Sequence, residues 1–107
     1  MTWQLSYYNA KVAATIAAWP TGIRARFLRI VEVMHEHGPD LGMPHTRAMG
    51  VGLFEIRAKS SEGIGRVFYC TQVGRRIVIL HAFIKKTEKT PAPDLETARK
   101  RLREVRT

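Results

Sequence analysis

The spacing of apolar residues changes several times along the chain, and each change marks a predicted element. In WQLSYY, residues 3–8, apolar and polar residues alternate, which predicts a short strand because strand side chains point to alternate faces. Asn9 is a favourable N-cap for a helix over AKVAATIAAW. Pro20 would end that helix, since proline lacks a backbone N–H.

Two further segments have the period of a helix. From Thr21, which we assign as a cap, to Gly38 and Pro39, apolar residues recur at i, i+4, i+7, i+8 and i+11. They form one stripe: Ile23, Phe27, Ile30, Val31 and Met34. The last segment, DLETARKRLREVRT, places Leu95, Ala98, Leu102 and Val105 on one side of a helix.

Between the second and the last helix the pattern predicts a loop and three strands. Residues 39–52, PDLGMPHTRAMGVG, are rich in glycine and proline and are interpreted as a loop. The strands are LFEIRA, IGRVFYCTQV and RRIVILHAFIK. SSEG closes the first hairpin, and a two-residue loop, Gly74 and Arg75, closes the second. The element order, β-α-α-β-β-β-α, predicts one α+β domain over residues 1–107.

These two turns fix which residues face each other across the predicted sheet. Arg57 lies opposite Arg66, Val73 opposite Arg76, and Phe68 opposite His81. One face is then apolar and forms the core: Phe54, Ile56, Val67, Tyr69, Val78, Leu80 and Ala82. The other face carries the chemistry: Glu55, Arg57, Arg66, Phe68, His81, Phe83 and Lys85.

The net charge of the chain indicates which classes of partner it is expected to bind. The 107 residues include 18 Lys and Arg against 9 Asp and Glu, a net charge of +9. Such a basic domain usually binds something acidic, and nucleic acid is favoured over an anionic membrane surface or an acidic protein. No apolar run approaches the roughly 20 residues that span a bilayer, and the N-terminal residues do not resemble a signal peptide. With a single cysteine, Cys70, the chain is expected in the cytoplasm.

The opposed arginines suggest an anion site. Two like charges directly across a hairpin are unfavourable unless something negative lies between them. Glu55 can neutralise only part of the charge of Arg57, Arg66 and Lys85, so a phosphate is the natural ligand. Replacing Arg66 by alanine should then cost little stability, because a repulsive pair is removed. The alternative is a solvated charged face with no ligand.

The motifs LFEIR, GRVFY and ILHAFIKKTEKTP, followed by a helix that starts near DLETA, resemble one known family. They are similar to the phage-derived branch of the RelE/HigB-like toxins of type II toxin–antitoxin systems. The specific likeness covers roughly residues 50–100, and the earlier residues match only in element order. It implies a RelE-like fold in which a helical hairpin and a C-terminal helix pack on a small, mostly antiparallel sheet.

The resemblance also implies a function and its partners. The chain would be an mRNA interferase, an endoribonuclease that cuts message on the ribosome, stops translation and arrests growth. Its partners would be mRNA and a cognate antitoxin, typically of the helix-turn-helix type, with no metal or organic cofactor and no membrane. Two other hypotheses stay open: a ParE-like toxin that inhibits DNA gyrase by binding it, and a basic module that binds nucleic acid without cutting it.

Carried onto this sequence, the basic positions of the family's site are Arg57, Arg66, Lys85 and Lys86. Guanidinium groups stay protonated and therefore suit charge stabilisation rather than proton transfer. Related enzymes often use a late tyrosine, but no tyrosine follows Tyr69 here. Lys85, Glu55 and His81 thus remain alternative acids or bases. Residues predicted to contact the RNA backbone are Lys86, Lys89, Lys59 and Arg99.

Overall fold

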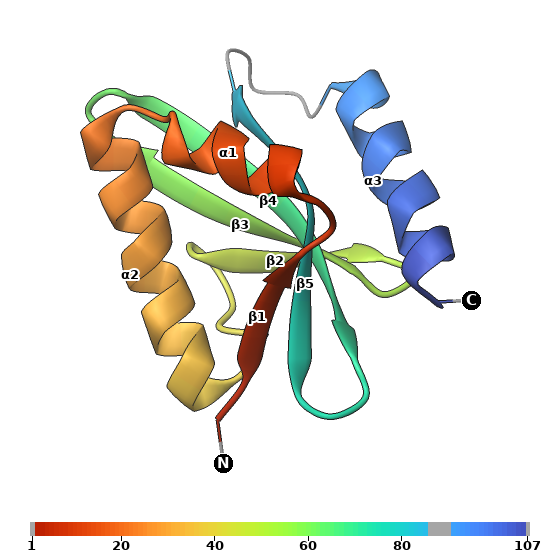
Figure 1. Cartoon of the computed structure of the whole chain (residues 1–107). Helices are drawn as coiled ribbons and strands as arrows, with labels where there is room; N and C mark the ends of the chain where they lie inside the picture. Colours follow the sequence, from red (N-terminus) through yellow and green to blue (C-terminus); the bar gives the residue numbers. More distant parts are fainter. Residues whose placement is uncertain (1, 86–90, 107) are drawn as a thin grey trace.

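The computed structural model describes residues 2–85 and 91–106, which form five strands and three helices (Figure 1). The strands are β1 (Gln4–Tyr7), β2 (Thr46–Gly50), β3 (Leu53–Ser60), β4 (Gly63–Gln72) and β5 (Arg76–Lys85). The helices are α1 (Ala10–Ala17), α2 (Thr21–His37) and α3 (Ala92–Arg106).

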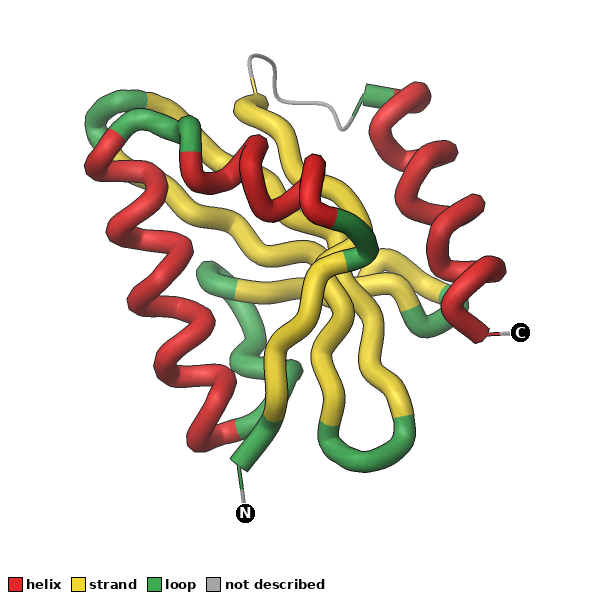
Figure 2. The backbone as a smooth tube through the Cα atoms, viewed as in Figure 1, coloured by secondary structure: helices red, strands yellow, loops and turns green. Residues whose placement is uncertain are grey.

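One sheet in the order β1-β5-β4-β3-β2 forms the middle layer, with β1 parallel to β5 and the other neighbours antiparallel. Helices α1 and α2 lie on one side of the sheet and α3 on the other (Figure 2). The first core contains the buried stripe of α2 that the sequence predicts, and the second contains Ala98 and Leu102 of α3. The sheet is therefore buried on both faces. None of the described helices has both the length and the apolar character that crossing a membrane requires.

The first half of the chain follows the prediction with three corrections. Asn9 caps α1 as expected, its side chain accepting a hydrogen bond from the N–H of Val12, but the helix ends at Ala17. Pro20, not Thr21, is the N-cap of α2, and it makes no side-chain capping bond. Part of the predicted loop is a strand: β2 pairs with β3 at the edge of the sheet. Glycine and proline on both sides of this short edge strand hid it.

The two hairpins differ in how well the sequence predicted them. The first is confirmed, since Ser60 pairs with Gly63 and Arg57 with Arg66. The second has a longer loop, because Gln72 pairs with Arg76 and the predicted pairing of Val73 with Arg76 is wrong. A bulge between Phe68 and Tyr69 on one strand and Ile79 and His81 on the other restores the predicted register, and Phe68 does pair with His81.

Because of the changed register before that bulge, the first half of β5 presents its side chains to the opposite faces from those predicted. Val78 and Leu80 pack with Phe68 beneath α3, whereas Ile77 and Ile79 belong to the core under α1 and α2. The prediction had grouped Val78 and Leu80 with Tyr69, which lies in the core under α1 and α2. Alternation could not decide the matter, because a strand covered on both faces is apolar almost without interruption.

Candidate anion-binding face

The face of the sheet that contacts α3 has an apolar part and a charged part. Ala98 and Leu102 of α3 cover the apolar part, which includes Phe68, Val78 and Leu80. Beyond it, the strand register brings charged side chains from β2, β3, β4 and β5 to the same side. We call this part the cationic face; it consists of Arg47, Glu55, Arg57, Lys59, Arg66 and Lys85.

Glu55 lies at the centre of the cationic face and is completely buried. Its Oε2 accepts a hydrogen bond from Nη1 of Arg66 at 2.7 Å, and its Oε1 accepts one from Nε of Arg47 at 3.1 Å. Arg66 is itself only 2% exposed, so this is a buried ion pair. One carboxylate thus holds two guanidinium groups in fixed positions.

The buried pair overturns one expectation about Arg66. The sequence suggested that its removal would relieve repulsion from Arg57 at little cost. In the structure, removal would leave the buried carboxylate of Glu55 with an ion pair to Arg47, a partly exposed residue. Breaking a buried ion pair by deleting one member typically costs about 3–5 kcal/mol. Arg66 therefore supports the fold as well as any chemistry.

Arg57 is placed differently from Arg66, although the two face each other across the hairpin. Its backbone N–H donates to the carbonyl of His45 at 2.9 Å, which anchors the strand there. Its side-chain Nε is buried and makes no hydrogen bond with any described residue. A buried donor without an acceptor costs about 1–3 kcal/mol, so Arg57 offers a donor that an anion would satisfy.

His81 lies at the border between the apolar part and the cationic face. Its Nε2 is 2.6 Å from Oδ1 of Asp94, which belongs to the first turn of α3. Its ring stacks on Phe83 with the centroids 5.8 Å apart. Sequence reasoning selected His81 but missed Asp94. An acidic residue such as Asp94 is common in the first turn of a helix, where it interacts favourably with the helix dipole. No local sequence pattern linked it to β5.

The remaining predicted site residues fall into three groups. Lys85 is half-buried at the end of β5, opposite Ile64, and Lys59 is exposed on β3. Arg99 donates Nη2 to the carbonyl of Met49 at 3.1 Å, so it also joins α3 to the edge of the sheet. Lys86 and Lys89 lie outside the described residues.

Other arginines of α3 have structural contacts. Arg101 donates to the carbonyl of Leu80 at 2.7 Å and stacks its guanidinium on the ring of Tyr8. The hydroxyl of Tyr8 donates to Glu104, and this hydrogen bond together with burial raises the pKa of the tyrosine. Basic residues of the last helix therefore attach it to β5, to the edge strand β2 and to Tyr8, the residue after β1.

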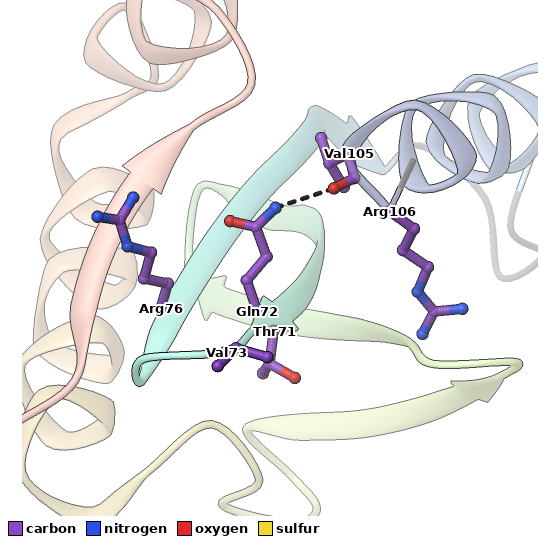
Figure 3. A pocket seen from close by; sticks show the side chains of 6 residues that line it. All are labelled: Thr71, Gln72, Val73, Arg76, Val105 and Arg106. Atoms are coloured by element: carbon purple, nitrogen blue, oxygen red, sulfur yellow. Dashed lines mark hydrogen bonds between the residues drawn. The ribbon is translucent and has the colours of Figure 1, made fainter.

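A second basic region lies where the β4–β5 hairpin meets the end of α3 (Figure 3). Here Gln72 donates to the carbonyl of Val105 at 3.0 Å, and Arg76 and Arg106 lie on opposite sides of this bond. We call it the hairpin hollow; about 600 Å³ in volume, it is lined by Thr71, Gln72, Val73, Arg76, Val105 and Arg106.

Neither region contains an evident metal site. In the part of the chain that the structure describes, no three His, Cys, Asp or Glu side chains lie close enough together to hold a metal ion. Cys70 is a buried free thiol whose pKa is raised by burial, which suits a core residue rather than a nucleophile.

Comparisons with known proteins agree with the fold. Residues 14–103 match a family model described as "Phage derived protein Gp49-like (DUF891)". No curated protein matches the chain. Among solved structures, the archaeal RelE–RelB complex from Pyrococcus horikoshii contains a similar chain, with a TM-score of 0.55 and 21% identity over 80% of this chain and 98% of that one.

A second similar chain belongs to the toxin–antitoxin complex RelBE2 from Mycobacterium tuberculosis. Its TM-score is 0.56 at 16% identity, over 79% of this chain and 100% of that one. At such identities the likeness establishes the fold. The predicted α+β, RelE-like architecture is confirmed, and the match to a phage-derived family agrees with the resemblance that the sequence motifs indicated.

Proposed function

The chain belongs to the Gp49-like family of phage-derived proteins, and from that premise we propose that it is the toxin of a toxin–antitoxin system. As such a toxin it cleaves mRNA on its cationic face, on the ribosome, and thereby stops translation. Its partners are the message and a cognate antitoxin of the helix-turn-helix type. The two similar chains come from RelE–RelB and RelBE2 complexes, which supports an antitoxin partner.

The observation that carries this proposal is the imbalance of charge on the cationic face. Among the residues of this face that the structure describes, five are cationic (Arg47, Arg57, Lys59, Arg66 and Lys85) and one, Glu55, is a carboxylate. The buried Nε of Arg57 adds a donor that no described residue satisfies. A phosphate group supplies both the negative charge and the acceptors that this arrangement favours.

Cleavage of RNA through its own 2′-OH requires a base, a group that stabilises the dianionic phosphorane, and an acid for the leaving oxygen. Arg57 is the residue best suited to the phosphorane, because its Nε is desolvated and has no acceptor among the described residues. Arg66, whose guanidinium is held by Glu55, contributes a second positive charge. Both Glu55 oxygens accept hydrogen bonds from guanidinium groups, so His81 and Lys85 are better candidates for proton transfer than Glu55.

The proposal is tested with purified protein and its Arg57→Ala variant in a translation reaction, with the ends of the message mapped by primer extension. We expect the wild-type protein to produce new 5′ ends and the variant to produce almost none. Arg26→Ala is a matched control, because Arg26 is an exposed arginine of α2 on the opposite side of the sheet. Intact message with relaxed plasmid DNA would favour gyrase inhibition. Intact message bound without any inhibition would favour a binding module.

A further inference from the structure

We propose that His81 and Asp94 form the proton-transfer pair of the cationic face. His81 is the general base that accepts the proton of the 2′-OH, and Asp94 is a positioning residue that holds its ring. This inference rests on the proposed function, since it assigns a step of that reaction. It adds Asp94, a residue that neither the motifs nor the fold comparison singled out.

The hydrogen bond between the two side chains determines which ring nitrogen can act. Asp94 Oδ1 lies 2.6 Å from His81 Nε2, and an ionised carboxylate accepts hydrogen bonds but does not donate them. Nε2 therefore carries the proton, and the lone pair of the neutral ring is on Nδ1. The side chains are 20% and 27% exposed, so the pair is shielded but reachable from solvent.

The ring is held from two directions. Phe83 stacks against it from the same strand, with an interplanar angle of 29°. On the other side, α3 brings Asp94, and this helix is fixed close to His81 because Arg101 binds the carbonyl of the preceding residue, Leu80. A base held by several contacts keeps the orientation that proton transfer requires without further ordering.

Charged groups around His81 explain why a carboxylate is needed there. Arg66 of β4 faces Phe83 across the strands and is a diagonal neighbour of His81, typically about 7–8 Å away between Cα atoms. Lys85 follows on the same strand, and Arg101 approaches from α3. These cations oppose a positive imidazolium, whereas Asp94 stabilises it in direct contact. Glu55 lies two strands away, opposite Phe68, and is occupied by its two arginines.

Nδ1 of His81 takes the proton of the 2′-OH while the 2′ oxygen forms a bond to phosphorus. Arg57 and Arg66 stabilise the negative charge, and the bond between phosphorus and the 5′ oxygen breaks. The departing oxygen takes a proton from the Lys85 ammonium or from solvent water. The products are a 2′,3′-cyclic phosphate and a 5′-hydroxyl. The imidazolium returns its proton to water, and a Lys85 amine that has given up its proton regains one from water.

The test compares Asp94→Asn with wild-type protein and with Glu96→Gln, a control that alters an exposed carboxylate of the same helix. Two quantities are measured: the pH dependence of the cleavage rate and the pH titration of the His81 ring by NMR. We expect Asp94→Asn to cut about 10²-fold more slowly at neutral pH. The acid limb of its rate profile and the midpoint of the ring titration should both move to lower pH.

The outcomes separate this inference from the proposed function. If Asp94→Asn slows cleavage equally at every pH, or leaves the ring titration unchanged, Asp94 only fastens α3 and the inference is wrong while the nuclease stands. Asp94→Glu should recover part of the rate if the carboxylate itself matters. If the wild-type protein cuts no message, the proposed function is wrong, and so is the role of His81 as a general base. The titration then still reports whether the pair exists as a structural contact.

Discussion

Two regions of this molecule are rich in arginine, and they are built in opposite ways. On the cationic face, Arg66 is 2% exposed and ion-paired to a fully buried Glu55. In the hairpin hollow, Arg76 and Arg106 are exposed, and Val73 between the strands is 98% exposed. Among the contacts that the structure describes, Arg106 donates a hydrogen bond to the backbone carbonyl of Val51 at 3.1 Å and to no acidic side chain.

The contrast between these two regions shows that net charge alone does not locate a reactive site. Exposed cations interact through water and are screened by salt, so each contributes little energy but attracts a polyanion over a distance. Packed cations act in a medium of lower polarisability and do not reorganise when a charge develops between them. We therefore expect chemistry at the cationic face and salt-dependent attraction at the hairpin hollow.

The largest effect is expected from removing the arginine that the fold depends on. Arg66→Ala should destabilise the protein by about 3 kcal/mol, the lower end of the range for a broken buried pair, because Arg47 still contacts Glu55. The melting temperature should fall by about 10 °C or more, measured by circular dichroism. Arg106→Ala, its counterpart in the hairpin hollow, should shift it by a few degrees at most. Equal melting temperatures would show that burial does not distinguish the two regions.

Arg57→Ala should separate catalysis from stability. Its removal relieves the penalty of the buried, unsatisfied Nε and loses the packing of a half-buried side chain. These effects oppose each other, so the free energy of unfolding should change by less than about 1 kcal/mol. The cleavage rate should fall by about 10²–10³-fold, the usual cost of losing one group that stabilises developing charge. Single-turnover cleavage of a defined message on ribosomes measures this rate. A variant that cuts at the normal rate would show that the cationic face is not the active site.

The comparison also shows what the sequence could predict. The pairing of Arg57 with Arg66 was predictable, because the SSEG turn and the alternation on both strands agreed. The faces of Val78 and Leu80 were not, because a bulge in a doubly covered strand leaves no trace in the hydrophobic pattern. The contact between His81 and Asp94 depends on how α3 docks, which is tertiary information.

The two lysines after the last strand offer a smaller test of the same face. Lys85 pairs with Ile64 beyond the bulge, where the predicted register holds, so it points to the cationic face. Lys85→Ala should therefore lower the cleavage rate more than Lys86→Ala does, by about tenfold or more if it supplies the leaving-group proton. Lys86 lies outside the described residues, and its side remains a prediction. If Lys86→Ala is the inactive variant and Lys85→Ala cuts normally, the assignment of Lys85 is wrong.

The smallest effect is expected in the hairpin hollow itself. Arg76→Gln removes one exposed charge and leaves the buried pair of Glu55 and Arg66 untouched. If the hollow serves only to attract RNA, the maximal cleavage rate should not change. The slope of log affinity against log salt should decrease by about 0.7, the value for one phosphate contact on a single strand. Affinity for a single-stranded RNA, measured at several salt concentrations, gives this slope. A loss of maximal rate instead would contradict this assignment, because losing a contact made equally in the ground state and the transition state leaves the maximal rate unchanged.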